Sequence, residues 1–207
     1  MGYIKQNVET HRYYLQPRVL NIGYALLQGM DMNDLASPSL KELSLRCGET
    51  VNMAIRDGVE LVYVERLKTQ QIININLHVG SRLPLHNTSM GRALIAYQPQ
   101  QWLREYISQL PPEAAEYARR GGRKLLGILE EARRKKYAIN NEDLAKGLRS
   151  VATQIWNRNR EVVAAVNIAV PSVRVSLKGL EEIYAPQLLE TAREISATLG
   201  GTGGAIE

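Results

Sequence analysis

The residues best suited to chemistry lie between Gly80 and Ala96, where a short strand should run through a polar bend into an apolar helix. The first backbone N–H groups of a helix have no acceptor inside the helix and together carry roughly half a positive charge. Small residues at this helix start allow a carboxylate to approach those groups. We therefore expect an anion-binding site within this stretch.

The histidines and the cysteine do not form a catalytic set. His11, His78 and His86 are the three histidines, and the spacing of the last two is not that of a zinc site. Cys47 has no base at a suitable spacing, so we expect it to be a small core residue. His86 either points a ring nitrogen at a ligand or stabilises the turn around it. We predict no catalytic residue, no metal and no cofactor.

The composition suits one medium-sized domain with attachments. Of the 207 residues 44% are hydrophobic, which is enough for one sizeable core although Phe is absent. A single cysteine excludes an internal disulfide and suits a reducing compartment. No apolar run approaches the roughly 20 residues of a membrane span, and the N-terminus lacks the apolar segment of a signal peptide. We expect a cytoplasmic protein without membrane contact.

The net charge of +5 depends on one segment. Between Arg119 and Lys136 there are eight basic residues against Glu130 and Glu131, a local charge of +6. The apolar residues among them are spaced like the buried stripe of an amphipathic helix. A solvated cationic helix face is therefore favoured over a phosphate-binding surface.

The N-terminal residues predict a hairpin, because two β-rich runs at 2–6 and 11–15 flank a polar stretch. A lone two-stranded hairpin is marginally stable, so we expect this one to end a larger unit. Lys5, Arg12 and Arg18 could contact phosphate, or they could only keep the hairpin soluble. The residues by themselves favour neither alternative.

The next third of the chain predicts a helix followed by antiparallel strands. Ser37 is expected to be the N-cap of a helix that starts at Pro38 and stops at Gly48. Two alternating runs around Asp57-Gly58 predict a hairpin, and a third run at 71–77 should continue the sheet. Asn52 and Arg66 lie in these strands, where most polar residues face water, and both are kept in reserve as ligand contacts.

A late strand carries another candidate. Residues 161–170 should form a strand in which Val163, Ala165, Asn167 and Ala169 share one face. A polar Asn167 among small residues fits a strand that faces a ligand. It equally fits a sheet edge where the amide meets water.

Two motifs resemble the effector-binding domain of IclR-family bacterial transcriptional regulators. The first is the order of Gly80, Arg82-Leu83-Pro84, His86, Thr88-Ser89 and Gly91-Arg92-Ala93-Leu94. In the second, an acidic turn at 140–143 leads through Gly147-Leu148-Arg149 into a strand. The matches follow the family order from about residue 11 to Gly200.

The resemblance implies a binding site for a small acid. The backbone amides of Ser89 and Met90 would hold the acid, and His86 precedes them. Asn141 stands where family members often have Asp, and Ser150 matches a Cys or Ser. Asn167 and Ala169 match two Ser positions. These two departures imply an effector that is larger or less hydroxylated than glyoxylate or pyruvate.

Shorter fragments resemble a subgroup of the family. Residues 147–152, 164–169 and 174–176 are similar to Pca/Pob-type regulators of protocatechuate, hydroxybenzoate and β-ketoadipate metabolism. The resemblance therefore implies an aromatic acid or a β-ketoadipate-type catabolite as the effector.

The fold implied is α+β, a GAF-like domain with an antiparallel sheet flanked by helices. Residues 1–16 would be the remnant wing of a winged helix-turn-helix domain, 17–30 a linker helix, 31–200 the effector-binding domain and 201–207 a disordered tail. Lys5 and Arg12 would contact only the DNA backbone, because the recognition helix that reads bases would precede this chain.

The implied partners are a small organic acid, operator DNA through the N-terminal domain, and further copies of the chain in a homodimer or a dimer of dimers. Two other functions stay open. A GAF-like sensory module could have an output other than DNA binding, and a metal-dependent enzyme would need a metal site that the histidine spacing does not suggest.

Overall fold

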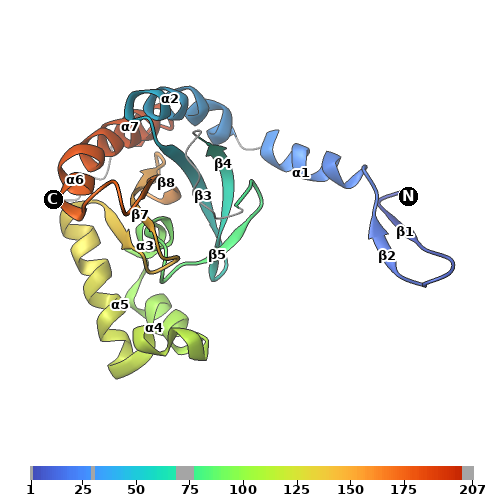
Figure 1. Cartoon of the computed structure of the whole chain (residues 1–207), viewed down its shortest axis with the longest axis horizontal. Coiled ribbons are helices and arrows are strands. Elements are labelled where there is room, and N and C mark those ends of the chain that lie inside the picture. Colours follow the sequence, from blue (N-terminus) through green and yellow to red (C-terminus); the bar gives the residue numbers. More distant parts are fainter. Residues whose placement is uncertain (1, 29–30, 69–76, 202–207) are drawn as a thin grey trace.

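The computed structural model describes residues 2–28, 31–68 and 77–201. An N-terminal arm stands apart from the rest of the molecule (Figure 1). It consists of the antiparallel strands β1 (Ile4–Gln6) and β2 (Tyr13–Leu15), followed by helix α1 (Val19–Gln28). The predicted hairpin is therefore confirmed, and every residue of its two strands is exposed.

A six-stranded sheet forms the centre of the remaining chain. Its spatial order is β5-β4-β3-β8-β7-β6, and each neighbouring pair is antiparallel. The strands are β3 (Thr50–Asp57), β4 (Glu60–Leu67), β5 (Arg82–Pro84), β6 (Ala138–Asn141), β7 (Leu148–Trp156) and β8 (Val162–Pro171). Residues 71–76 of the expected third strand lie outside the described residues.

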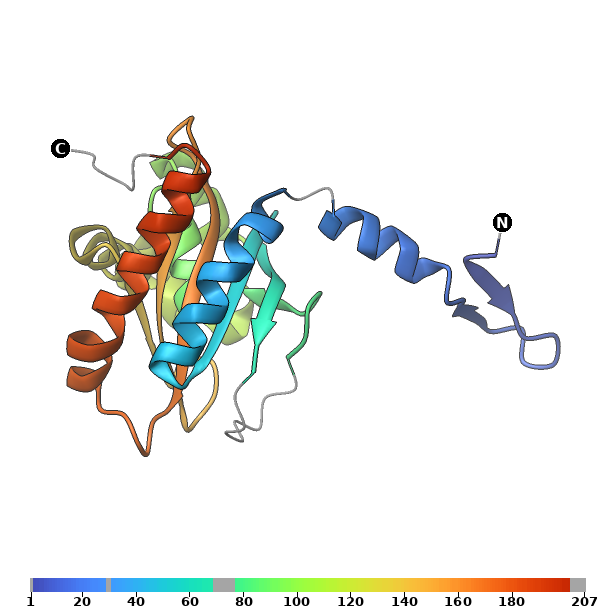
Figure 2. The same ribbon diagram turned by 90° about the horizontal axis from the view of Figure 1, so that it is seen from above.

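Helices cover both faces of the sheet, so the expected α+β architecture is confirmed. Helices α2 (Asp31–Cys47) and α7 (Ala185–Thr198) lie side by side on one face (Figure 2). On the other face are α3 (Ser89–Ile95), α4 (Gln100–Ser108) and α5 (Ala115–Lys135). Short helical turns join them: η1 (Pro112–Ala114), α6 (Leu177–Gly179) and η2 (Leu180–Tyr184).

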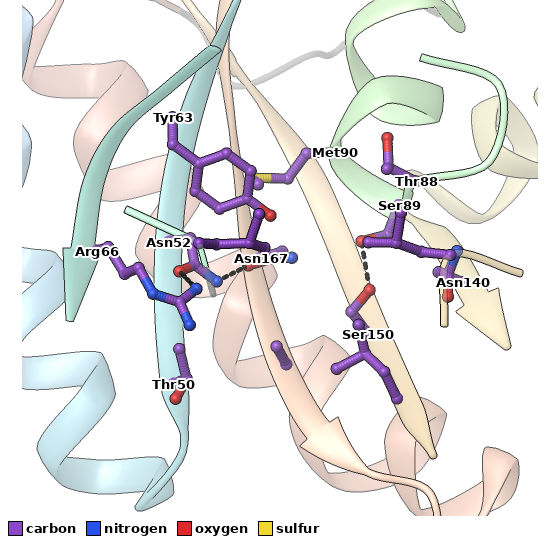
Figure 3. A pocket seen from close by; sticks show the side chains of 14 residues that line it. Thr50, Asn52, Tyr63, Arg66, Thr88, Ser89, Met90, Asn140, Ser150 and Asn167 are labelled. Carbon is purple, nitrogen blue, oxygen red and sulfur yellow. Dashed lines mark hydrogen bonds between the residues drawn. The ribbon is translucent and has the colours of Figure 1, made fainter. Parts of the chain in front are cut away.

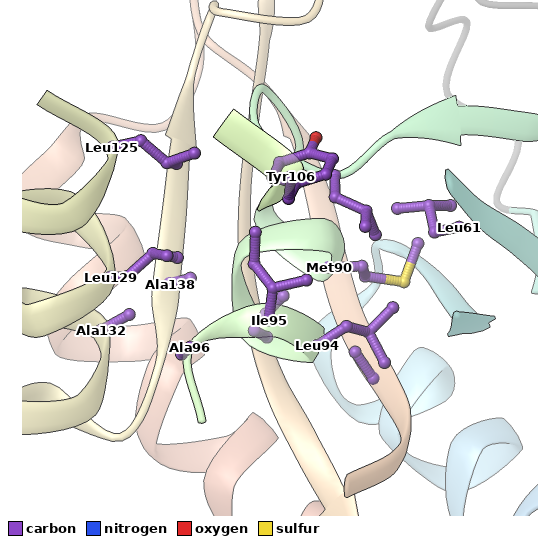
Figure 4. Close-up of a cluster of buried hydrophobic side chains, with 14 of the residues drawn as sticks. Leu61, Met90, Leu94, Ile95, Ala96, Tyr106, Leu125, Leu129, Ala132 and Ala138 are labelled. Atoms are coloured by element: carbon purple, nitrogen blue, oxygen red, sulfur yellow. The ribbon is translucent and has the colours of Figure 1, made fainter. Parts of the chain in front are cut away.

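The sheet separates two hydrophobic cores. The first packs α3, α4 and α5 onto the sheet through residues such as Met90, Leu94 and Leu129 (Figure 4). The second packs α2 and α7 onto the opposite face, with Leu40 and Leu188 fully buried. Because the strand is buried on both faces, β8 carries one polar residue, Asn167.

The predicted start of α2 is wrong, because the helix begins at Asp31 and carries Pro38 inside it. Its buried side extends one turn further back than expected, since Ala36 is buried below Leu40 and Leu43. Pro38 itself is exposed, so the hydrogen bond that proline cannot donate is missing only on the water side. The predicted stop is confirmed: Gly48 has φ +67°, a left-handed conformation that favours glycine.

The turn between β3 and β4 and the charged face of α5 were both predicted from the sequence. The β3–β4 hairpin is confirmed, but Asp57 pairs with Glu60, so the turn residues are Gly58 and Val59. On α5 the basic residues Arg123, Lys124 and Arg133 are exposed, as expected of a cationic helix face. Within the described part of the chain, no helix is both long and apolar enough to cross a membrane.

The end of the chain begins to differ from the expected tail at its first residue. Gly201 is buried, and a Cβ there would lie 2.3 Å from the backbone oxygen of Trp156. Residues 202–207 lie outside the described residues.

Candidate functional site

A cavity lies between the start of α3 and the sheet (Figure 3). Its enclosed volume is about 30 Å³, and all the empty space inside it and its open mouth together comes to about 440 Å³. Its described lining residues come from five strands, from α3 and from two loops: Thr50, Asn52, Tyr63, Arg66, Leu77, Thr88, Ser89, Met90, Asn140, Leu144, Leu148, Ser150, Asn167 and Ala169.

The start of α3 closes one side of this cavity because two hydrogen bonds fix the preceding turn. Thr88 is the N-cap, and its hydroxyl accepts a hydrogen bond from the N–H of Gly91 (3.1 Å). The same hydroxyl donates to the carbonyl of Pro84 (2.8 Å). Gly91 also permits a close approach, since a Cβ there would lie 2.4 Å from the backbone of Leu85. The polar turn and the helix therefore act as one rigid wall.

One row of polar residues crosses the floor of the cavity. Asn52 pairs with Arg66 on one neighbouring strand and with Asn167 on the other. Arg66 Nη1 donates to Asn52 Oδ1 (2.9 Å), and Asn52 Nδ2 donates to Asn167 Oδ1 (2.7 Å). This chain fixes the orientation of both amides, because a guanidinium can only donate. Asn167 is left with its NH₂ group as the donor that it can offer to a ligand.

A bulge in β4 places a charge beside an aromatic ring. The register shifts between Met53 and Ala54, so Arg66 and Tyr63 share the cavity face although they are three residues apart. Burial raises the pKa of Tyr63 to about 12. Burial also lowers the pKa of the Arg66 guanidinium, which nevertheless stays charged at neutral pH. Arg66 is the one charged side chain among the described lining residues.

A second row lies one step further along the strands. Asn140, Ser150, Ala169 and Thr50 are successive cross-strand partners on β6, β7, β8 and β3. The hydroxyls of Ser150 and Ser89 are 2.7 Å apart and share a hydrogen bond. The hydroxyls of Ser89 and Ser150 and the amide of Asn140 lie at the end of the cavity remote from Arg66, whereas Thr50 lies on the side of Arg66 (Figure 3).

The comparison with protein families decides what this domain is. Residues 24–197 match the model of the bacterial transcriptional regulator IclR C-terminal domain. The chain belongs to the IclR family. It contains the effector-binding C-terminal domain of a transcriptional regulator and is not an enzyme.

Individual IclR-family proteins agree with this assignment. The chain is 32% identical over 203 residues to the Pca regulon regulatory protein of Pseudomonas putida, covering 97% of this chain and 69% of that protein. It is 29% identical over 206 residues to the transcriptional regulator KdgR of Escherichia coli, covering 97% and 76% respectively. The Thermotoga maritima IclR structure superimposes with a TM-score of 0.78 at 27% identity, covering 96% of this chain and 80% of that one.

A further solved structure shows the same fold. A transcriptional regulator from Rhodococcus sp. RHA1 matches with a TM-score of 0.82 and 33% identity. The match covers 96% of this chain and 79% of that one.

Most of the residues selected from the sequence meet at the cavity of this IclR domain. Ser89, Met90, Ser150, Asn167 and Ala169 all line it. Asn52 of β3 and Arg66 of β4, which were kept in reserve as ligand contacts, line it as well.

Two residues that were selected as ligand contacts, His86 and Asn141, do not line this cavity. The backbone N–H of His86 donates to the hydroxyl of Tyr106 (3.1 Å), and its Nδ1 lies 3.1 Å from the same hydroxyl. His86 is therefore part of the turn's packing, which is the structural alternative of the two considered. Asn141 is exposed, and its Oδ1 accepts from Arg149 Nε (2.7 Å). Lys5 and Arg12 lie on the exposed arm.

Sequence reasoning missed four polar lining residues, namely Thr50, Tyr63, Thr88 and Asn140. Strand alternation was the available signal for Asn140, because successive side chains of a strand point to opposite faces. The residue next to Asn141 therefore had to face the other way.

Cys47, a possible nucleophile, has a structural position in the fold. Burial raises the pKa of the Cys47 thiol, and Cys47 packs against the second core. This makes the thiol a poor nucleophile. Across residues 2–28, 31–68 and 77–201, no group of three His, Cys, Asp or Glu side chains could hold a metal ion.

Proposed function

We propose that this domain binds a small organic acid, either an aromatic acid or a β-ketoadipate-type catabolite, in the cavity between α3 and the sheet. Binding modulates the affinity of the regulator for its operator. The observation that carries the proposal is the half-buried Arg66, which brings a positive charge to a cavity otherwise lined by neutral side chains in the described part of the chain.

The backbone amides of Ser89 and Met90 were expected to hold the acid, but the hydrogen bonds of Arg66, which lines the same cavity, suit its carboxylate better. Nη1 is taken by Asn52, while the buried Nε has no acceptor among the described residues. The edge formed by Nε and Nη2 is thus available for two parallel hydrogen bonds to one carboxylate. Such a pair is strengthened where water is partly excluded.

The remaining lining supports an organic body larger than a two-carbon acid. Tyr63, Leu77, Met90 and Leu148 contribute apolar surface that a ring or a methylene chain can cover. The Pca regulon regulatory protein of Pseudomonas putida is among the relatives, which supports the same class of effector.

The output of the domain follows from its connection to the arm. Effector binding would shift a homodimer or a dimer of dimers between two states that differ in operator affinity. Such a shift is limited by the difference in effector affinity between the states, typically 1–3 kcal/mol. Lys5 and Arg12 on the exposed hairpin would add contacts to the DNA backbone, while bases are read by helices N-terminal to it.

Thermal unfolding with added acids tests the proposal. Protocatechuate, 4-hydroxybenzoate or β-ketoadipate should raise the unfolding temperature, because a ligand that binds only the native state stabilises it by about 2.7 kcal/mol at 100 times its Kd. The methyl ester of 4-hydroxybenzoate has no carboxylate and should give little or no rise.

Two variants locate the effect. Arg66→Met should abolish the rise, whereas Arg104→Met, which removes an exposed arginine of α4, should keep it. The proposal is contradicted if no acid changes the unfolding temperature, or if the ester is as effective as the acid.

A further inference from the structure

One residue that lines the cavity, Asn140, carries a buried hydrogen-bond acceptor without a donor among the described residues. Asn140 is 1% exposed, and its Nδ2 donates to the backbone carbonyl of Asn87. A carbonyl can only accept, so this bond fixes which end of the Asn140 amide is nitrogen. Asn140 Oδ1 is then buried with no hydrogen-bond partner in the part of the chain that the structure describes. Leaving such an acceptor unsatisfied is costly, so a donor is expected to occupy the space beside it.

Asn140 and Arg66 lie at opposite ends of the same cavity. Arg66 comes from β4 and reaches over Asn52 on β3, whereas Asn140 lies on β6 beside Ser150 on β7. Figure 3 shows Asn52, Asn167 and Ser150 between the two ends. The guanidinium reaches β3, and β3 is three strand spacings from β6, which at about 4.8 Å per spacing is roughly 14 Å.

We propose that the effector carries a hydroxyl group at the end remote from its carboxylate, and that this hydroxyl donates to Asn140 Oδ1. The inference rests on the proposed function, because it takes Arg66 as the carboxylate site. The Ser89 and Ser150 hydroxyls lie on the same side of the cavity and can donate to the oxygen of that hydroxyl. A hydroxyl next to the carboxylate would not reach Asn140.

This proposal changes one expectation about the effector. Ala169 offers no hydrogen bond and by itself implies a less hydroxylated ligand. Its row, however, ends on Asn140, which supplies an acceptor two strands away. Asn140 therefore supplies, at the far end of the cavity, a hydrogen bond that Ala169 cannot make.

Titration calorimetry with matched acids tests the inference. The probes are 4-hydroxybenzoate, 4-methylbenzoate, which has a similar shape but no donor, and 2-hydroxybenzoate, whose hydroxyl is beside the carboxylate. The native protein should bind 4-hydroxybenzoate about tenfold more tightly than either of the other two acids.

The Asn140→Leu variant should bring the affinity ratio of 4-hydroxybenzoate to 4-methylbenzoate close to one. Asn141→Ala, a change on the opposite face of the same strand, should leave the ratio as it is in the native protein. Because each variant is judged by a ratio of two ligands, a general loss of affinity does not affect the comparison. The ratio in the native protein stays decisive if Asn140→Leu does not fold.

The outcomes separate the two proposals. Equal binding of 4-hydroxybenzoate and 4-methylbenzoate to the native protein overturns the inference but leaves the acid site, and a water molecule then satisfies Asn140. Binding of β-ketoadipate without binding of any hydroxybenzoate also overturns the inference and leaves the acid site. An unchanged ratio in Asn140→Leu also overturns the inference. If no acid binds at all, the proposed function itself fails.

Discussion

His86 packs among aromatic side chains in the turn before α3. Its ring lies between two tyrosines, with centroids 6.5 Å from Tyr106 and 5.1 Å from Tyr117. Burial lowers the pKa of His86, the positive charge of Arg92 lowers it further, and Glu116 opposes the shift. The folded protein therefore favours the neutral imidazole.

The titration of His86 predicts a pH-dependent stability. Its pKa is about 6.5 in the unfolded chain and lower in the folded one, so its contribution is complete above about pH 6.5 and is lost as pH falls toward the folded value. Denaturant unfolding between pH 7.5 and 5.5 should show a loss of at most about 1.4 kcal/mol per pH unit from this one group. His86→Gln should remove that part of the slope.

His78→Gln supplies the control, because His78 is exposed. It should leave the pH slope as it is in the native protein. A slope that is the same in His86→Gln and in the native protein would contradict the assignment.

Single residues also show what the sequence could predict about the site. Ser89 and Met90 could be predicted from the sequence because a helix start is a local feature, recognisable from its capping residues. Asn140 and Asn141 differ only in the face to which they point, so an error of one residue selects the wrong side of the strand. Tyr63 and Arg66 share a face only because of the β4 bulge, which depends on pairing with β3 and has no local signature.

At the scale of elements, α3 is held in place by one buried arginine. Arg92 is 3% exposed and donates to the carbonyls of His86 (2.8 Å) and Ile139 (2.6 Å). It also donates to the hydroxyl of Tyr117 (3.2 Å) and to the carboxylate of Asp143 (2.8 Å). A single side chain thus connects the helix that closes the cavity to β6, to α5 and to the turn after β6.

Removing this guanidinium should weaken the whole domain. Arg92→Met leaves four acceptors without their donor, and we expect a loss of about 2 to 4 kcal/mol in the free energy of unfolding. Arg82→Met is the matched control, since Arg82 pairs with Asp57 and Glu60 at an exposed site. That change should cost much less of the free energy of unfolding than Arg92→Met does, because exposed ion pairs contribute little. Equal losses in urea unfolding of the two variants would contradict the role of Arg92.

The start of α2 illustrates why element boundaries were harder to predict than element types. Ser37 and Pro38 form a favourable helix start on local grounds. Packing of Ala36 in the second core nevertheless extends the helix to Asp31. Burial on the sheet outweighs the missing hydrogen bond of an exposed proline, and burial is not visible in the local sequence.

At the scale of the whole molecule, the arm and the sheet domain contribute unequally to folding. Both strands of the arm are entirely exposed, and the hairpin extends away from the sheet (Figures 1 and 2). Among the described side chains, the two cores on either side of the sheet are built from residues after position 31. The domain should therefore fold and bind its effector without the arm.

A shortened chain that starts at Asp31 tests this division. Its free energy of unfolding should stay within about 0.5 kcal/mol of the full chain, because nearly all the described side chains of residues 2–25 are exposed, and the acid-induced rise in unfolding temperature should be unchanged. A chain that lacks α7 is the comparison, because it removes a helix of the sheet domain instead of the arm. It should not fold, because Leu188, Ala192 and Ile195 of α7 are buried in the second core. A loss of the acid response on removal of residues 1–30 would instead mean that the arm shapes the cavity, and sensing and folding would not be confined to one unit.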